Sequence, residues 1–173
     1  MQPQHDRKRR APVSRDLLLV CQLKATPLAC YRCWTEADLL KKFFAPAPGR
    51  TLEAVIEPRP GGRFFTKMLF DVHGEIADEG CILHASRPTP DRPGRLIFTD
   101  SLSEGFRPKG SGFFTADIRF TAKDGGCEYR VIARHKDDAT ADNHAKLGFQ
   151  TGWTAVAKQL EALARTLDAV HAA

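Results

Sequence analysis

Three histidines and two carboxylates are the side chains in this sequence best suited to proton transfer. His73 lies in a predicted turn, whereas His84 and His135 lie near the ends of predicted strands, from which a side chain can reach a pocket. Imidazole titrates near neutral pH, so each histidine is a candidate general acid or base. Their spacing forms no legible Ser/His/Asp arrangement, and a structural or surface role is the more frequent one for each.

Asp100 and Glu79 are candidate pocket carboxylates because both fall in predicted strands. Successive side chains of a strand point to opposite faces, so a shift of one residue in strand phase moves a carboxylate from the pocket to the surface. The sequence therefore leaves His84, Asp100 and His135 as catalytic candidates only, and it assigns no catalytic residue.

A further motif with chemical potential is the C-x-x-C formed by Cys30 and Cys33. A redox pair needs a thiolate stabilised at a helix N-terminus, and a zinc site needs two more ligands at suitable spacing. No second C-x-x-C exists, and Cys81 and His84 are distant in sequence. The two cysteines are interpreted as small buried hydrophobic residues, and neither a metal nor a cofactor is expected.

Composition is typical of globular proteins and argues against several other classes. The chain is 42% hydrophobic and 27% charged, and it contains no apolar run near the roughly 18 residues that cross a bilayer. The five cysteines are an odd number, and the start does not resemble a secretion signal, so no disulfide framework is expected. A cytoplasmic protein without a membrane partner is the default expectation.

The net charge of +5 comes mostly from residues 1–15, where five basic side chains oppose one aspartate. This segment is polar and contains two prolines, so we predict a disordered basic tail at residues 1–15 and a single domain at residues 16–170. The rest of the chain carries about +1 of the charge, which argues against a nucleic-acid partner. The run Arg7-Lys8-Arg9-Arg10 is suited to phosphate contact, but a solvated tail is the more frequent case.

A long C-terminal helix is the clearest element that would position these residues. Apolar residues recur at alternating spacings of four and three, which marks one helical face; they are Phe149, Trp153, Val156, Leu160, Leu163, Leu167 and Val170. A stripe of this length must be buried, and the predicted partner is a sheet. The helix is predicted to begin near residues 139–142. Gly148 and Gly152 lower helix propensity, and a close approach of helix to sheet is the expected compensation.

Most of the remaining chain predicts strands joined by tight turns. A strand over residues 16–25 precedes two short helices, the first started by Thr26 and Pro27 and the second capped by Thr35. Six further strands are predicted, at residues 51–57, 63–71, 75–85, 95–102, 112–121 and 127–136. Gly80, within the third of these, suggests a bulge or a close backbone approach. Strands joined by tight turns are antiparallel. The predicted fold class is therefore α+β, a curved antiparallel sheet of about seven strands around the long helix.

Five strings in this order resemble the START-like superfamily, and more narrowly the SRPBCC proteins related to the activator of the heat-shock-protein-ninety ATPase. They are residues 31–35, 40–46, 58–64, 96–99 and 148–153, within a match over about residues 15–167. The resemblance implies a helix-grip fold with a pocket between helix and sheet. The family often has two tryptophans where Phe43 and Phe44 stand and an aromatic residue where Asp100 stands, so ligand preference does not carry over.

The resemblance and the aromatic residues together favour a small apolar or amphipathic ligand between the long helix and the sheet. Such pockets are mostly apolar with a few polar groups, although an aromatic stripe at helical spacing is usually packed core. The predicted lining consists of Trp34, Phe43, Phe44, Phe64, Met68, Phe98, Phe114, Ile118, Phe149, Trp153 and Val156.

Proteins with this resemblance include hydrophobic-ligand binders, polyketide cyclases, stress-related proteins and co-chaperone domains, and no single set of catalytic residues unites them. A non-enzymatic binding protein is the leading expectation. Two alternatives stay open: a co-chaperone-like module acting on a chaperone ATPase through its surface, and a cyclase or hydrolase that uses the same cavity. A homodimer is a further open option.

Overall fold

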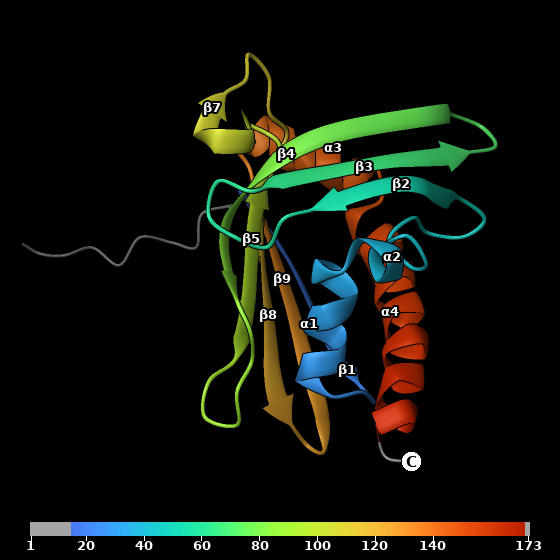
Figure 1. The fold of residues 1–173 in the computed structure, drawn as a ribbon. Helices are drawn as coiled ribbons and strands as arrows, with labels where there is room; N and C mark the ends of the chain where they lie inside the picture. Colours follow the sequence, from blue (N-terminus) through green and yellow to red (C-terminus); the bar gives the residue numbers. More distant parts are fainter. Residues whose placement is uncertain (1–14, 172–173) are drawn as a thin grey trace, which may run out of the picture.

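The chain forms a strongly bent antiparallel sheet that encloses helices on its concave side (Figure 1). The structure, a computed structural model, describes residues 15–171. The predicted basic tail, apart from Arg15, lies outside these residues. Between Arg15 and His171, no helix has both the length and the apolar character that crossing a membrane would require.

Seven strands make up the sheet in the order β1-β9-β8-β5-β4-β3-β2, and every neighbouring pair is antiparallel. Their bounds are Asp16–Leu23 (β1), Arg50–Ile56 (β2), Arg63–Phe70 (β3), Gly74–Ser86 (β4), Gly94–Thr99 (β5), Thr115–Lys123 (β8) and Gly126–Arg134 (β9). A small ribbon pairs β6 (Leu102–Ser103) with β7 (Arg107–Pro108). The predicted α+β class with about seven strands around a long C-terminal helix is confirmed.

The hairpin between β8 and β9 follows from its turn residues. Asp124 and Gly125 both have positive φ angles, of 50° and 73°, and this conformation suits the right-handed twist of paired strands. On its other side β9 pairs with β1 over the full length of β1. The first and last strands of the domain therefore lie side by side.

Within the described residues, four α-helices accompany the sheet: α1 (Pro27–Thr35), α2 (Ala37–Leu40), α3 (Asp138–Lys146) and α4 (Phe149–His171). As predicted, α1 starts at Pro27, and the Thr26 hydroxyl accepts a hydrogen bond from the Ala29 amide. The prediction that Thr35 caps α2 is wrong. The Thr35 hydroxyl donates instead to the Tyr31 carbonyl, at 2.9 Å, because a threonine at the end of α1 reaches the open carbonyl one turn back.

The predicted start of the long helix near residues 139–142 is also wrong, because two helices occupy this region. Gly148 separates them with a φ of +96°, a conformation that glycine adopts without steric cost. A Cβ atom at Gly148 or Gly152 would meet no non-neighbouring atom within 4 Å. The expected close approach of helix to sheet is therefore wrong for both glycines: Gly148 makes the turn, and Gly152 faces open space.

The solid part of the core lies between α1, the later turns of α4 and the strands β1, β8 and β9. Trp34 of α1 is fully buried, and its ring lies 5.5 Å from Phe43 and 6.1 Å from Trp153, centroid to centroid. Leu160 and Ala164 of α4 are also fully buried. In Figure 1, β2, β3 and β4 extend across the N-terminal end of α4, away from this solid core.

Candidate ligand-binding site

A cavity of about 440 Å³ lies between the N-terminal half of α4 and the part of the sheet that crosses it. Ligand pockets occupy roughly 300–1,000 Å³, so the space is large enough for a small molecule. The lining residues are Phe44, Pro46, Phe64, Thr66, Met68, Phe70, Ile76, Asp78, Gly80, Phe98, Thr99, Asp100, Phe113, Phe114, His144, Leu147, Gly148, Phe149, Gly152, Trp153 and Val156.

Strand phase explains the wall formed by β3 and β4. Every second residue of β3 faces the cavity, as the alternation in its sequence predicts; these are Phe64, Thr66, Met68 and Phe70. Their Cα partners on β4 include Ile76, Asp78 and Gly80, which line the same wall. A Cβ atom at Gly80 would lie 2.4 Å from the Thr99 carbonyl oxygen. The close backbone approach predicted for Gly80 is confirmed.

Helix α4 contributes the opposite wall through one face of its first two turns. Phe149, Gly152, Trp153 and Val156 line the cavity, at spacings that bring them onto one side of a helix. The Trp153 ring lies nearly parallel to that of Trp34, with an interplanar angle of 14°. Because Gly152 has no side chain, the space beside Trp153 stays unfilled.

Eight of the eleven predicted lining residues border the cavity, namely Phe44, Phe64, Met68, Phe98, Phe114, Phe149, Trp153 and Val156. The other three, Trp34, Phe43 and Ile118, belong to the closed core and are at most 1% exposed. Ile118 shares its strand face with Phe114, but it lies four residues further on, about 13 Å along the strand. The cavity does not extend that far.

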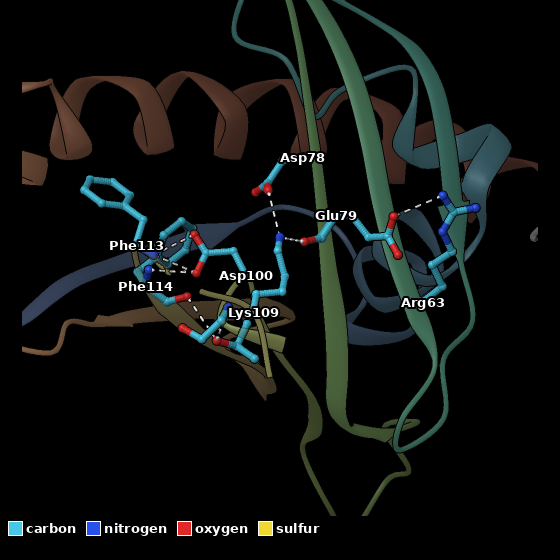
Figure 2. A network of polar contacts seen from close by, with 9 residues as sticks. Arg63, Asp78, Glu79, Asp100, Lys109, Phe113 and Phe114 are labelled. Atoms are coloured by element: carbon cyan, nitrogen blue, oxygen red, sulfur yellow. Dashed lines mark hydrogen bonds and ion pairs between the residues drawn. The ribbon is translucent and has the colours of Figure 1, made fainter. Parts of the chain in front are cut away.

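The candidate carboxylate Asp100 lies at the cavity and holds the chain before β8. Its two oxygens accept hydrogen bonds from the Phe113 amide at 2.8 and 2.9 Å, and one of them also accepts from the Phe114 amide at 3.2 Å (Figure 2). Both aromatic rings line the cavity. Asp100 therefore positions two of the aromatic side chains that form the cavity wall.

The second carboxylate at the cavity is Asp78, one residue before the candidate Glu79. The Glu79 carboxylate points to the other face of β4 and pairs with Arg63 at 3.3 Å (Figure 2). Lys109 donates to the Glu79 carbonyl, and its Nζ lies 3.9 Å from Asp78. Lost hydration raises the pKa of Asp78, and the charge of Asp100 raises it further, whereas Lys109 opposes the shift.

The three predicted histidines do not line the cavity. His73 lies exposed in its turn, as predicted, and His84 is exposed with its Nε2 at 3.1 Å from the Ser86 hydroxyl. His135 is 8% exposed and reaches the cavity only through a neighbour. Its Nε2 lies 2.8 Å from Nδ1 of His144, which is a lining residue.

Like Asp78, His144 is a polar lining residue that the sequence interpretation missed. Burial, reinforced by the nearby His135, lowers its pKa to about 4, so the imidazole is neutral at physiological pH. A signal was present: Ala141 and His144 are spaced as one buried face of a helix, and Asp137 caps that helix through the Thr140 amide. The sequence pattern predicted one continuous helix in place of α3 and α4, so the buried face of α3 was not recognised.

The C-x-x-C cysteines do not show the properties of a reactive pair. Burial raises the pKa of Cys33 to about 12, and hydrogen bonding with Cys127 together with burial raises the pKa of Cys30. A thiol with a raised pKa forms little thiolate, which is the reactive and metal-binding species. Within residues 15–171, no three His, Cys, Asp or Glu side chains are grouped so as to hold a metal ion.

The fold and the apolar cavity define a helix-grip domain of the START-like superfamily. The family model described as "Activator of Hsp90 ATPase homolog 1-like protein" matches residues 24–165, and the chain belongs to this family.

Solved structures support the same fold. A protein from Nitrosomonas europaea is 31% identical, with a TM-score of 0.82, over 92% of this chain and 99% of that chain. One from Rhodobacter sphaeroides is 19% identical, with a TM-score of 0.73, over 90% and 97% of the two chains. The AHSA1-like protein from Aeromonas hydrophila is 12% identical, with a TM-score of 0.61, over 88% and 94%. The last two likenesses concern the fold alone. No curated protein matches the sequence.

Proposed function

We propose that this protein binds a small apolar or amphipathic molecule in the cavity between α4 and the sheet. The observation that carries the proposal is a cavity of about 440 Å³ whose walls are mainly apolar, with eight Phe or Trp side chains among them. Protein interiors are normally close-packed, so a hollow of this size leaves apolar side chains of its walls open to water. A bound apolar molecule covers these side chains, at about 25 cal/mol for each Å² of apolar surface removed from water.

Trp153 offers the direct test because its ring lines the cavity and stacks on the closed core. We expect Trp153→Ala to weaken binding of the neutral fluorescent probe N-phenylnaphthylamine about tenfold, since it removes a large apolar contact. Arg119→Ala is the control, because Arg119 is an exposed residue of β8 outside the cavity. Probe titration, with thermal unfolding of each variant, measures the effect, and equal affinities for the two variants would contradict the proposal.

Native mass spectrometry of freshly purified protein provides an independent test. If the cavity holds its ligand tightly, a species heavier than the chain by the mass of a small molecule is expected, and denaturation should release that molecule. A spectrum of the bare chain, combined with no probe binding, would leave the cavity without a binding role.

A co-chaperone role is the second candidate. It is favoured by the match to the family described as "Activator of Hsp90 ATPase homolog 1-like protein". Such a role would use the surface of the domain and would need no small ligand. Its test is the ATPase rate of a purified Hsp90-type chaperone with and without this protein. Stimulation that survives Trp153→Ala would favour the surface role, whereas an unchanged rate would remove it.

A further inference from the structure

Two histidines connect the start of β1 to the cavity through a chain of hydrogen bonds. The backbone amide and Nδ1 of His135 lie 3.1 and 2.8 Å from the Arg15 carbonyl oxygen. On the other side of the ring, His135 Nε2 lies 2.8 Å from His144 Nδ1. The His135 ring is therefore fixed at both nitrogens.

The carbonyl of Arg15 determines which atom donates in each of these hydrogen bonds. A carbonyl oxygen only accepts, so Nδ1 of His135 must carry a proton and donate it. Nε2 of a neutral His135 is then an acceptor, and Nδ1 of His144 must be the donor between the two rings. A neutral His144 is left with an unprotonated Nε2 that has a lone pair to offer.

His144 lies in the wall of the cavity among aromatic side chains. His144 is 9% exposed and lines the cavity. The rings of Phe113, Phe114 and Phe149 lie 4.8 to 5.1 Å from its ring, centroid to centroid. In residues 15–171, the enclosed polar side-chain atoms without a partner are Trp34 Nε1 and Tyr129 Oη. His144 Nε2 is not one of these enclosed atoms, and none of the hydrogen bonds of residues 15–171 occupies it, which leaves it available to accept from a molecule in the cavity.

The charged side chains at the cavity act as acceptors as well. Asp78 and Asp100 contribute carboxylates, and none of the described residues that line the cavity is Lys or Arg. Thr66 adds a hydroxyl, which is able both to donate and to accept. An ionised carboxylate on a ligand would meet like charges here, and it would offer no proton to His144.

We infer that the cavity selects neutral apolar molecules that carry a hydroxyl group, and that this hydroxyl donates its hydrogen bond to His144 Nε2. The inference rests on the proposed function, because it names the class of molecule that the cavity holds. His144 is the residue that contacts the ligand. His135 is a positioning residue, since it acts only by fixing the tautomer of His144.

The test compares β-naphthol with its O-methyl ether, two probes of similar shape that differ in one donated hydrogen bond. Calorimetric titration at about pH 8, where imidazole is neutral, should give roughly fivefold tighter binding of the naphthol by the wild-type protein. In His144→Phe the two affinities should become equal while the ether still binds. Equal affinities in the wild type would overturn the inference and leave the cavity proposal standing. Failure of both probes to bind would overturn both.

Nitrogen NMR of the imidazole side chains tests the inference without any substitution in the cavity. His144 should show a protonated Nδ1 and an unprotonated Nε2, and the Nε2 signal should shift when β-naphthol, but not its ether, is added. His135→Leu should leave His144 as a mixture of tautomers and reduce the preference for the naphthol. A proton on Nε2 of His144 in the wild-type protein would overturn the inference, even if the substituted proteins failed to fold.

Discussion

Asp117 shows how a single buried charge is held on the outer face of the sheet. Its side chain is fully buried, and it accepts hydrogen bonds from Arg95 at 2.9 and 2.7 Å and from Arg134 at 3.0 Å. Burial alone would raise the pKa of Asp117, but the hydrogen bonds from the two guanidinium groups outweigh it, and the pKa lies below its ordinary value. The two arginines cover the carboxylate while they remain partly in contact with water.

Replacing this charge should reduce stability in a pH-dependent way. We expect Asp117→Asn to lower the free energy of unfolding by about 2 kcal/mol at neutral pH. The folded pKa is depressed, so this stability is fully present above the unfolded value of about 4 and is lost as the pH falls through the lower folded value. Urea unfolding at several pH values measures the difference, which should shrink in acid. Asp91→Asn, in an exposed loop, is the control, and a pH-independent difference would contradict the account.

For single residues, the residue type predicted the apolar lining of the cavity better than it predicted the polar contacts. Aromatic residues such as Phe98 and Trp153 are mostly buried wherever the fold places them, so a core or cavity position followed from composition and periodicity. The contact between His135 and His144 depends on how β9 leads into α3, and the sequence interpretation did not separate that helix. The assignment of Asp78 rather than Glu79 depended on strand phase, where one residue reverses the face.

Among the elements, the long strands and α4 were predictable because their patterns repeat over many residues. The predicted strand at residues 63–71 corresponds to Arg63–Phe70, and the apolar stripe begins at Phe149, where α4 begins. Short elements contain too few residues to show a period. For this reason the ribbon of β6 and β7 and the separate helix α3 were not anticipated, although Gly148 marked the helix boundary.

Gly152 links the stability of α4 to the volume of the cavity. Gly152→Ala should raise the free energy of unfolding by about 0.5–1 kcal/mol, because alanine favours the helix and its methyl group enters open space. The same methyl group should weaken probe binding. Gly148→Ala is the matched control: its φ of +96° should make alanine destabilising by at least about 1 kcal/mol. Thermal unfolding and probe titration measure both effects, and a destabilised Gly152→Ala with unchanged binding would contradict this role.

For the whole molecule, the sheet is completed by the contact of its first strand with its last. The carbonyl of Arg15 accepts two hydrogen bonds from His135 at the point where β1 and β9 meet. The Arg15 carbonyl is therefore part of the folded unit, although the sequence places Arg15 in the predicted tail.

Two truncations test how much the contact between Arg15 and His135 contributes to stability. A chain that begins at Arg15 should unfold in one cooperative transition, within about 0.5 kcal/mol of the full chain. A chain that begins at Leu17 lacks the carbonyl and should lose about 1–2 kcal/mol, since buried donors of His135 are left without a partner. Calorimetry of the three chains distinguishes these outcomes. Equal loss in both truncations would mean that the preceding residues contribute to stability.

Helix α4 borders the cavity with its first two turns and the closed core with its later turns, and this division has an evolutionary consequence. A large-to-small substitution around Leu160 opens a new void in a closed interior, and such voids are costly. A substitution around Gly152 alters a wall that already borders empty space, so it disturbs fewer packed neighbours. Substitutions in the cavity wall are therefore able to accumulate without loss of the packing that stabilises the fold. Under the proposed binding function, proteins with this backbone are able to change the molecule that the cavity accepts while the closed core that stabilises the fold is retained.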